Sequence, residues 1–244
     1  MNEVMAIAGS TWRRILRMKV VYFLLLCVFV LISSAINYDV LSLQENKPLM
    51  IDVSLVLNTL AVALVVIAMT FEIPRELREG VAATLLTKPL GRTQYLVGKC
   101  IGSIITAVVI SVLITIGFFV IFWLSFGESV MQSLLEAHLL VAVSAIPMSA
   151  IAVLFSVLLP EMITPILTAI ALWFAFSTSR ILDSGVGKYF YGGVLPDLDL
   201  FNFKSYSMVS AGWPYFALVV IWGIVFSVFA LSLASLIFRF KDIK

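Results

Sequence analysis

Residues 71–99 read FEIPRELREGVAATLLTKPLGRTQYLVGK, a charged segment that lies between two long uncharged stretches of a 244-residue chain. The segment carries eight charged side chains, Lys99 included, whereas only 12% of the whole chain is charged and 62% is hydrophobic. Soluble globular domains contain about 25% charged residues. The composition therefore excludes a soluble domain and indicates an integral membrane protein.

Six uncharged runs on either side of this segment are long enough to cross a membrane. A bilayer core about 30 Å thick needs roughly 20 apolar residues in a helix. The predicted spans, the third of which extends its uncharged run back past Lys99, lie at about 20–38, 53–71, 94–124, 138–159, 162–179 and 213–238. Pro160 and Glu161 separate the fourth span from the fifth as a tight hairpin, because proline removes a backbone donor and favours a break. We expect an all-α integral membrane protein with a single transmembrane domain over residues 1–244.

The positive charges indicate how these spans are oriented. Of the 16 Lys and Arg residues, 12 fall on the side that holds both termini and the loop 72–99, and four fall on the other side. Cytoplasmic loops carry the excess of positive charge. Both termini and the loop 72–99 are therefore predicted to be cytoplasmic, and the loop 180–212 is predicted to lie outside.

The N-terminal residues 2–18 predict an amphipathic helix that lies along the inner leaflet. Trp12 falls on its apolar side at the depth of the headgroups, and Arg13, Arg14 and Arg17 fall on its polar side. Two interpretations stay open: a plain membrane anchor, or an elbow that also contacts a cytoplasmic partner.

The loop 72–99 predicts a helix, a break and a second helix. Pro74 suits a first helical position, the first helix should end before Pro89, and the second should begin near Thr93 and continue into the third span. Gly98 and Gly102 have the spacing of a close helix contact, although such glycine pairs also occur by chance. The ordered shape suits docking of a partner in a groove, but a solvated connector remains the alternative.

This loop also resembles a known family. Residues 76–92, ELREGVAATLLTKPLGR, followed by YLVGK at 95–99, resemble the first cytoplasmic loop of ABC-2 type transporter permeases. Members show an acidic-basic pair, a Gly, a Leu-Leu pair, Pro-Leu-x-Arg and a Gly-Lys. The stretch LPDLDLFNFK at 195–204 is similar to the segment before the last span of several such permeases. Val81 and Ala82 depart from the pattern, because many members carry Thr directly after the Gly.

The resemblance implies a transmembrane subunit in the inner membrane of a bacterial or archaeal cell. It implies a second permease subunit, in a homo- or heterodimer, and two copies of a cytoplasmic ATP-binding cassette subunit that hold the ATP and Mg. The loop between spans two and three would form the coupling helix. Its implied ATPase-coupling residues are Glu76, Leu77, Arg78, Glu79, Gly80, Val81, Leu85, Leu86, Pro89 and Arg92, with Glu161 in a smaller second contact.

The chain itself offers little chemistry. A phosphate-binding loop needs Lys followed by Ser or Thr, whereas Lys99 is followed by Cys100, and His138 is the single histidine. We therefore predict a non-catalytic subunit with no catalytic residue, metal ligand or bound cofactor of its own, and no nucleic-acid partner. The uncharged spans also argue against a carrier driven by ions, which keeps ionisable groups at mid-membrane.

Polar residues inside the spans have two interpretations. They form hydrogen bonds between helices, or they line a path that would suit a lipid-like or amphipathic cargo. The residues are Asn58, Thr59, Ser144, Ser149, Thr164 and Thr168. The apolar outer loop is likewise either an interfacial anchor or an outer gate formed by Leu195, Pro196, Leu198, Phe201 and Phe203.

We expect the permease subunit of an ATP-driven ABC-2 type exporter that contacts membrane lipid. The alternative is a membrane scaffold subunit whose ATPase-driven motion acts on a partner protein. An intramembrane enzyme is disfavoured, because the spans lack the required histidines and a mid-membrane aspartate.

Overall fold

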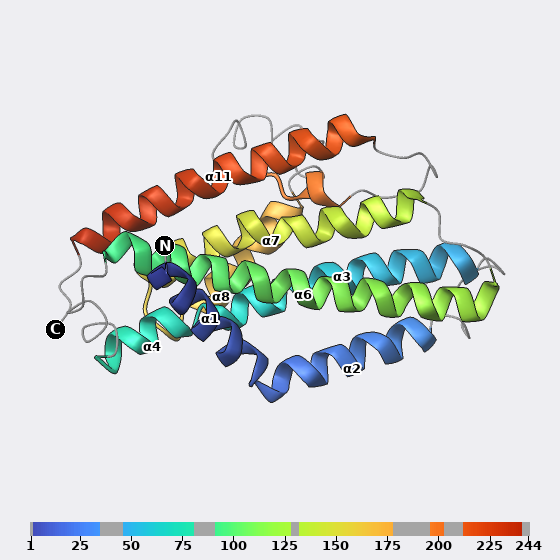
Figure 1. Ribbon diagram of the computed structural model, residues 1–244, viewed down its shortest axis with the longest axis horizontal. Helices are drawn as coiled ribbons and strands as arrows, with labels where there is room; N and C mark the ends of the chain where they lie inside the picture. The colour runs from blue at the N-terminus through green and yellow to red at the C-terminus, as the bar shows by residue number, and fades with distance from the viewer. Residues whose placement is uncertain are drawn as a thin grey trace.

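The computed structural model describes residues 2–34, 46–80, 91–127, 132–177, 196–202 and 212–240. Every regular element in these ranges is a helix, which confirms the all-α prediction. The long helices α3, α6, α7 and α11 run roughly along the long axis of the molecule (Figure 1). The elements are α1 (Asn2–Leu16), α2 (Lys19–Ser34), α3 (Asn46–Met69), α4 (Glu72–Arg78), α6 (Arg92–Phe126), α7 (Gln132–Leu158), α8 (Thr164–Phe176), the 3-10 helix η2 (Asp199–Phe201) and α11 (Trp213–Arg239).

Within the described ranges, four stretches of helix are long and apolar enough to cross a bilayer: Lys47–Arg78, Arg92–Phe126, Gln132–Leu158 and Trp213–Arg239. α2 and α8 are apolar but shorter, at 16 and 13 residues. Each of them ends at or next to the edge of a described range. Six spans therefore stay a prediction, of which the structure supports four.

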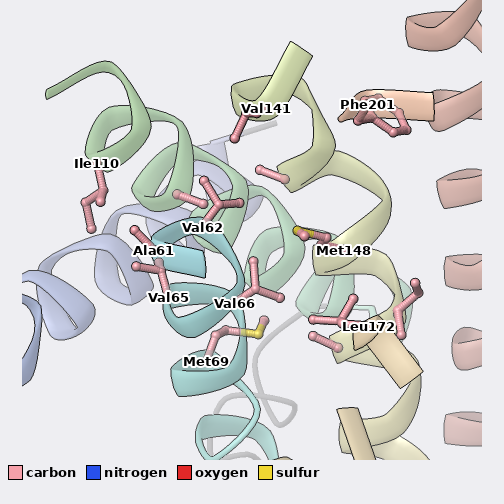
Figure 2. Close-up of a cluster of buried hydrophobic side chains, with 14 of the residues drawn as sticks. Ala61, Val62, Val65, Val66, Met69, Ile110, Val141, Met148, Leu172 and Phe201 are labelled. Carbon is pink, nitrogen blue, oxygen red and sulfur yellow. The ribbon is translucent and has the colours of Figure 1, made fainter. Parts of the chain in front are cut away.

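The core is built around α7. This helix is apolar on all sides, and 78% of its most apolar 18-residue stretch is buried, as expected of a helix at the centre of a bundle. It packs against α3, α6, α8 and α11. Figure 2 shows the side chains that meet there from α3, α6, α7, α8 and η2: Ala61, Val62, Val65, Val66, Met69, Ile110, Val141, Met148, Leu172 and Phe201.

The outward faces of the bundle are also apolar. Phe23 of α2, Trp123 of α6, Trp173 of α8 and Phe229 of α11 are each more than 60% exposed. Large contiguous apolar surfaces mark contact with a membrane or another protein. With the apolar helices, they make this chain a multi-pass membrane protein.

The break between α7 and α8 lies where the sequence predicts it. α7 ends at Leu158, Pro160 and Glu161 lie in the connection, and α8 begins at Thr164. The hairpin is therefore confirmed.

Candidate functional site

The end of the bundle that carries α1 and α4 holds a cluster of buried charges. α3 ends at Met69, the chain turns at Thr70 and Phe71, and α4 then buries Glu72 and Glu76 on one side. A buried carboxylate is costly unless it is paired and hydrogen-bonded. The partners of these two carboxylates show what α4 is attached to.

Lys99, near the start of α6, pairs with both carboxylates. Its Nζ lies 2.8 Å from Glu72 Oε2 and 2.7 Å from Glu76 Oε1, and its side chain is only 3% exposed. Tyr95, one turn earlier on α6, donates its hydroxyl to Glu76 Oε2 at 2.6 Å. The two carboxylates and the Tyr–Lys pair are each spaced four residues apart, so each pair shares one helix face. α4 is therefore fixed to the base of α6.

The N-terminal helix joins the same cluster. Arg14 Nη1 of α1 lies 2.9 Å from Glu76 Oε1, with about half of the arginine side chain exposed. Two cations thus face two anions. Arg14, Glu72, Glu76, Tyr95 and Lys99 are together called the inner charge cluster below.

Gly98 and Gly102 hold α1 against α6. A methyl group at Gly98 would lie 2.8 Å from Ile7 Cβ, and one at Gly102 would lie 2.8 Å from the Ala8 carbonyl oxygen. Both distances are shorter than side chains tolerate, so only glycine permits this approach. The predicted glycine contact is confirmed, and its partner is α1.

α1 is confirmed as a helix, and it is attached to the bundle. Arg13 and Arg17 are exposed and Trp12 is half-buried, as an interfacial helix requires. Because Arg14 and both glycine contacts also tie it to α4 and α6, α1 is more than a membrane anchor. Its contact with a cytoplasmic partner stays a prediction.

The predicted first helix of the cytoplasmic loop is shorter than expected. α4 ends at Arg78, and Gly80 has a φ of +72°. A residue in this left-handed conformation ends a right-handed helix, so the prediction of one helix from Pro74 to just before Pro89 is wrong. Val81, Leu85, Leu86 and Pro89 lie outside the described residues.

The exposed side of α4 carries the charges that a partner can reach. Arg75 Nε donates to Glu79 Oε1 at 2.8 Å, one helical turn apart. This hydrogen bond lowers the pKa of the Glu79 carboxyl. Glu79 therefore stays ionised on the outer surface of α4 at neutral pH.

Arg78 links α4 to the turn between α7 and α8. Its Nη1 lies 2.7 Å from Glu161 Oε2, and its side chain is 67% exposed. Beside this ion pair is a hollow of about 650 Å³ whose apolar walls include Leu77, Pro160 and Met162. Met162 is 85% exposed. Glu161 is predicted as a second, smaller contact with the ATPase. The structure places it directly beside Arg78 of α4, which belongs to the first predicted contact.

Arg92 occupies a different position from the one predicted. Its Nη1 donates to the carbonyl oxygens of Phe238 and Arg239 at 2.9 and 3.0 Å, which are among the last carbonyls of α11. A cation at this end of a helix satisfies free carbonyls and suits the helix dipole. Arg92 therefore fastens α6 to α11, and its contact with an ATPase stays a prediction.

The other predicted coupling residues that the structure describes differ in how exposed their side chains are. Glu76 is buried in the inner charge cluster and Leu77 is half-buried, whereas Arg78 and Glu79 are exposed. Glu76 consequently positions α4, and its predicted part in coupling to an ATPase stays a prediction. Sequence reasoning missed Glu72, Tyr95 and Lys99; their shared spacing of four residues was the available signal.

Four of the six polar residues of the possible cargo path are buried and make hydrogen bonds inside the bundle. The hydroxyls of Ser144, Thr164 and Thr168 donate to carbonyls of their own helical turns or of the preceding connection, and Ser149 donates to Ser103 at 3.0 Å. All four residues are buried. The predicted hydrogen bond between helices is therefore seen for Ser149, whereas the other three hydroxyls bond locally.

Asn58 takes part in a buried contact with His138. Asn58 Nδ2 lies 3.2 Å from His138 Nδ1, and Ser54 Oγ lies 3.4 Å from His138 Nε2. Because Ser54 Oγ also donates to the Ile51 carbonyl, the ring is a donor at Nε2 and an acceptor at Nδ1. The histidine is thus a structural link between α3 and α7.

Thr59 is the member of this set that lines a groove. The groove holds about 300 Å³ between α3 and α8, and its apolar walls include Leu60, Leu64, Trp173 and Phe176. Ligand pockets of proteins begin at about this volume and are mostly apolar. The groove suits an apolar molecule that enters from the side of the bundle.

Part of the predicted outer gate lies inside the bundle. Leu198 and Phe201 are fully buried, and Figure 2 shows Phe201 between α7 and the last helix. Tyr215 donates its hydroxyl to the Leu200 carbonyl at 2.7 Å, and the Leu198 amide donates to the Ala175 carbonyl at 3.1 Å.

Through these contacts, the described segment 196–202 packs against α7, α8 and α11 and joins them. Its Pro196 is also buried, and Leu195 and Phe203 lie outside the described residues. Burial raises the pKa of Asp197 in this segment.

No group of three metal-binding side chains is found in the part of the chain that the structure describes. The family described as "Multidrug efflux system permease Rv1217c, C-terminal domain" matches residues 40–184, more than half of the chain. The matched range contains α3, α4, α6, α7 and α8, with all of the inner charge cluster except Arg14. No curated protein matches the chain.

Proposed function

Because the chain belongs to the family of the multidrug efflux system permease Rv1217c, C-terminal domain, we propose that it is the permease subunit of an ATP-driven efflux transporter of the ABC-2 type. The inner charge cluster is the observation that carries this proposal. It makes α1, α4 and the base of α6 one rigid unit at the end of the bundle where the cytoplasmic loop begins.

The exposed residues of this unit supply the docking surface. Arg78 and Glu79 face outward, and the hollow beside Met162 accepts an apolar side chain of a partner. Removing one partner of a buried ion pair costs about 3–5 kcal/mol. A load applied to α4 therefore moves α6 with it and is not absorbed by local bending.

The energy source lies outside this chain. The sequence has no phosphate-binding loop, so ATP and Mg belong on two cytoplasmic ATP-binding cassette subunits. A second permease subunit, in a homo- or heterodimer, covers part of the exposed apolar surface, and the dimer sits in the inner membrane of a bacterial or archaeal cell.

The cargo enters through the groove between α3 and α8. Its walls of Leu60, Leu64, Trp173 and Phe176 offer apolar contact, and Thr59 and Asn202 supply the polar atoms. This chemistry suits an apolar or amphipathic cargo, such as a lipid-like molecule or an aromatic drug.

The test is to co-purify the chain with an ATP-binding cassette subunit from the same genome, and to measure ATP hydrolysis in vesicles. Arg78→Glu should weaken the complex and the stimulated hydrolysis, whereas Arg17→Gln, in the turn after α1, should change neither. A complex that survives Arg78→Glu unaltered contradicts the docking surface.

Transport separates the exporter from the scaffold alternative. The same vesicles are loaded with a fluorescent phospholipid or an aromatic dye, and ATP-dependent movement of each probe is followed. Movement supports the exporter. Stimulated hydrolysis with neither probe moved, together with an ATP-dependent change in a bound partner protein, supports the scaffold.

A further inference from the structure

A second groove lies where α6 and α11 meet at their charged ends. It holds about 420 Å³ and is lined by Thr93 and Val97 of α6 and by Val228, Ser232, Leu236 and Arg239 of α11, among others. It is separate from the inner charge cluster and from the groove between α3 and α8. Neither the proposed coupling nor the proposed cargo path uses it.

The walls of this groove are held in place by polar contacts. Arg92 fastens the end of α11 to the start of α6, and the hydroxyls of Thr93 and Ser235 lie 2.7 Å apart. The ring of Tyr95 stacks on that of Phe238, with centroids 6.1 Å apart. The groove is therefore a fixed feature of the helix pair.

The chemistry of the groove changes along its length. Thr93 and Arg239 lie at the charged end of the groove, whereas Val228 lies about 16 Å farther along α11. Val97, Val228, Leu231 and Leu236 supply apolar contact, and Ser232 adds a hydroxyl between Val228 and Leu236. Within the described residues, the exposed guanidinium of Arg239 forms no ion pair. Of the two hydroxyls of Thr93 and Ser235, one donates to the other, so the accepting hydroxyl keeps a proton for a further acceptor.

This order of groups matches an amphiphile with an anionic head. We propose that the groove binds an anionic phospholipid of the inner leaflet, with an acyl chain along Val97, Val228 and Leu236 and the phosphate against Arg239 and the hydroxyl groups. Basic pockets between spanning helices on the cytoplasmic side bind such headgroups. The positive charges place this end of the bundle in the cytoplasm.

A second copy of the chain is a poorer occupant. Neither α6 nor α11 contains an acidic residue. Isologous pairing of the same surface on two subunits would bring like patches together, so the Arg239 side chains would meet without a counter-charge. Charge complementarity therefore favours the lipid.

Native mass spectrometry of the purified chain tests the site, with phosphatidylglycerol and phosphatidylcholine as the two probes. We expect phosphatidylglycerol to stay bound and to raise the melting temperature, and phosphatidylcholine to do neither. Arg239→Gln should weaken phosphatidylglycerol binding about fivefold, the effect of one arginine near an anionic lipid. Ser232→Phe, which fills the groove and keeps the charge, should weaken it as well.

Arg17→Gln is the matched control, because Arg17 is exposed in the turn that follows α1 and does not line the groove. It should leave phosphatidylglycerol binding unchanged. Equal retention of both lipids, or an equal loss with Arg17→Gln and Arg239→Gln, overturns the proposal in favour of diffuse attraction. A disulfide-linked dimer of Ser232→Cys also overturns it, because a second copy then covers the groove.

Discussion

Lys99 Nζ lies 2.7 Å from Glu76 Oε1, in a place where both side chains are almost fully removed from solvent. The same ammonium lies 2.8 Å from Glu72 Oε2. One cation at the base of α6 thus binds both buried carboxylates of α4, which is the helix on which the proposed ATPase acts.

Replacing Lys99 tests this relationship. Lys99→Met leaves the two carboxylates buried with Arg14 as their one remaining cation, so we expect a loss of about 3–5 kcal/mol in stability. Thermal unfolding in detergent measures it. Arg75→Gln is the control, because the pair of Arg75 with Glu79 is exposed and its loss should change the melting temperature little. Equal melting temperatures for Lys99→Met and the unchanged protein would contradict the cluster.

The close contact between α1 and α6 predicts that a methyl group added at Gly102 lowers the stability of the protein, whereas one added at Gly9 does not. Gly102→Ala should displace α1, because the new carbon would lie 2.8 Å from the Ala8 carbonyl oxygen; overpacking costs typically 1–3 kcal/mol. Gly9→Ala, in α1 itself, meets nothing within 4 Å and should be neutral or stabilising. Thermal unfolding of the two variants compares them, and equal melting temperatures would refute the contact.

Arg78 and Glu161 allow a charge exchange. Arg78→Glu alone should cost less than about 1 kcal/mol, because exposed ion pairs contribute little, but it should reduce the stimulated ATP hydrolysis severalfold. Adding Glu161→Arg should recover the melting temperature without recovering the hydrolysis, since the partner still meets a reversed charge. Full recovery of hydrolysis would show that Arg78 serves only its ion pair with Glu161.

The groove between α3 and α8 predicts a loss of transport without a loss of ATPase binding. Leu64→Trp should fill the groove and reduce dye export about tenfold while the complex remains intact. Leu218→Trp is the control, because Leu218 is 67% exposed on α11 and lines no part of that groove. Unchanged export by Leu64→Trp would place the cargo elsewhere.

The sequence predicted the features that depend on local pattern. Apolar length identified the four long spans, Pro160 identified the break between α7 and α8, and the glycine spacing identified a close contact. Each of these signals lies within a few residues of the feature that it predicts.

Features that depend on tertiary packing were beyond the sequence. Lys99 was counted as a loop charge because charge counting does not distinguish a buried ammonium from an exposed one. Gly80 ends α4 through its backbone conformation, which the composition of the segment does not reveal. The hydroxyls inside the spans bond mostly to their own helices, so they leave no long-range pattern in the sequence.

The central position of α7 sets how much sequence change each helix can tolerate. The most apolar 18-residue stretch of α7 is 78% buried, whereas that of α11 is 22% buried. Close-packed interiors respond to the gain or loss of a single methylene group, but a side chain that faces lipid needs only to remain apolar. Random single substitutions spread evenly over the chain would therefore yield the fewest working variants in α7 and the most in α11.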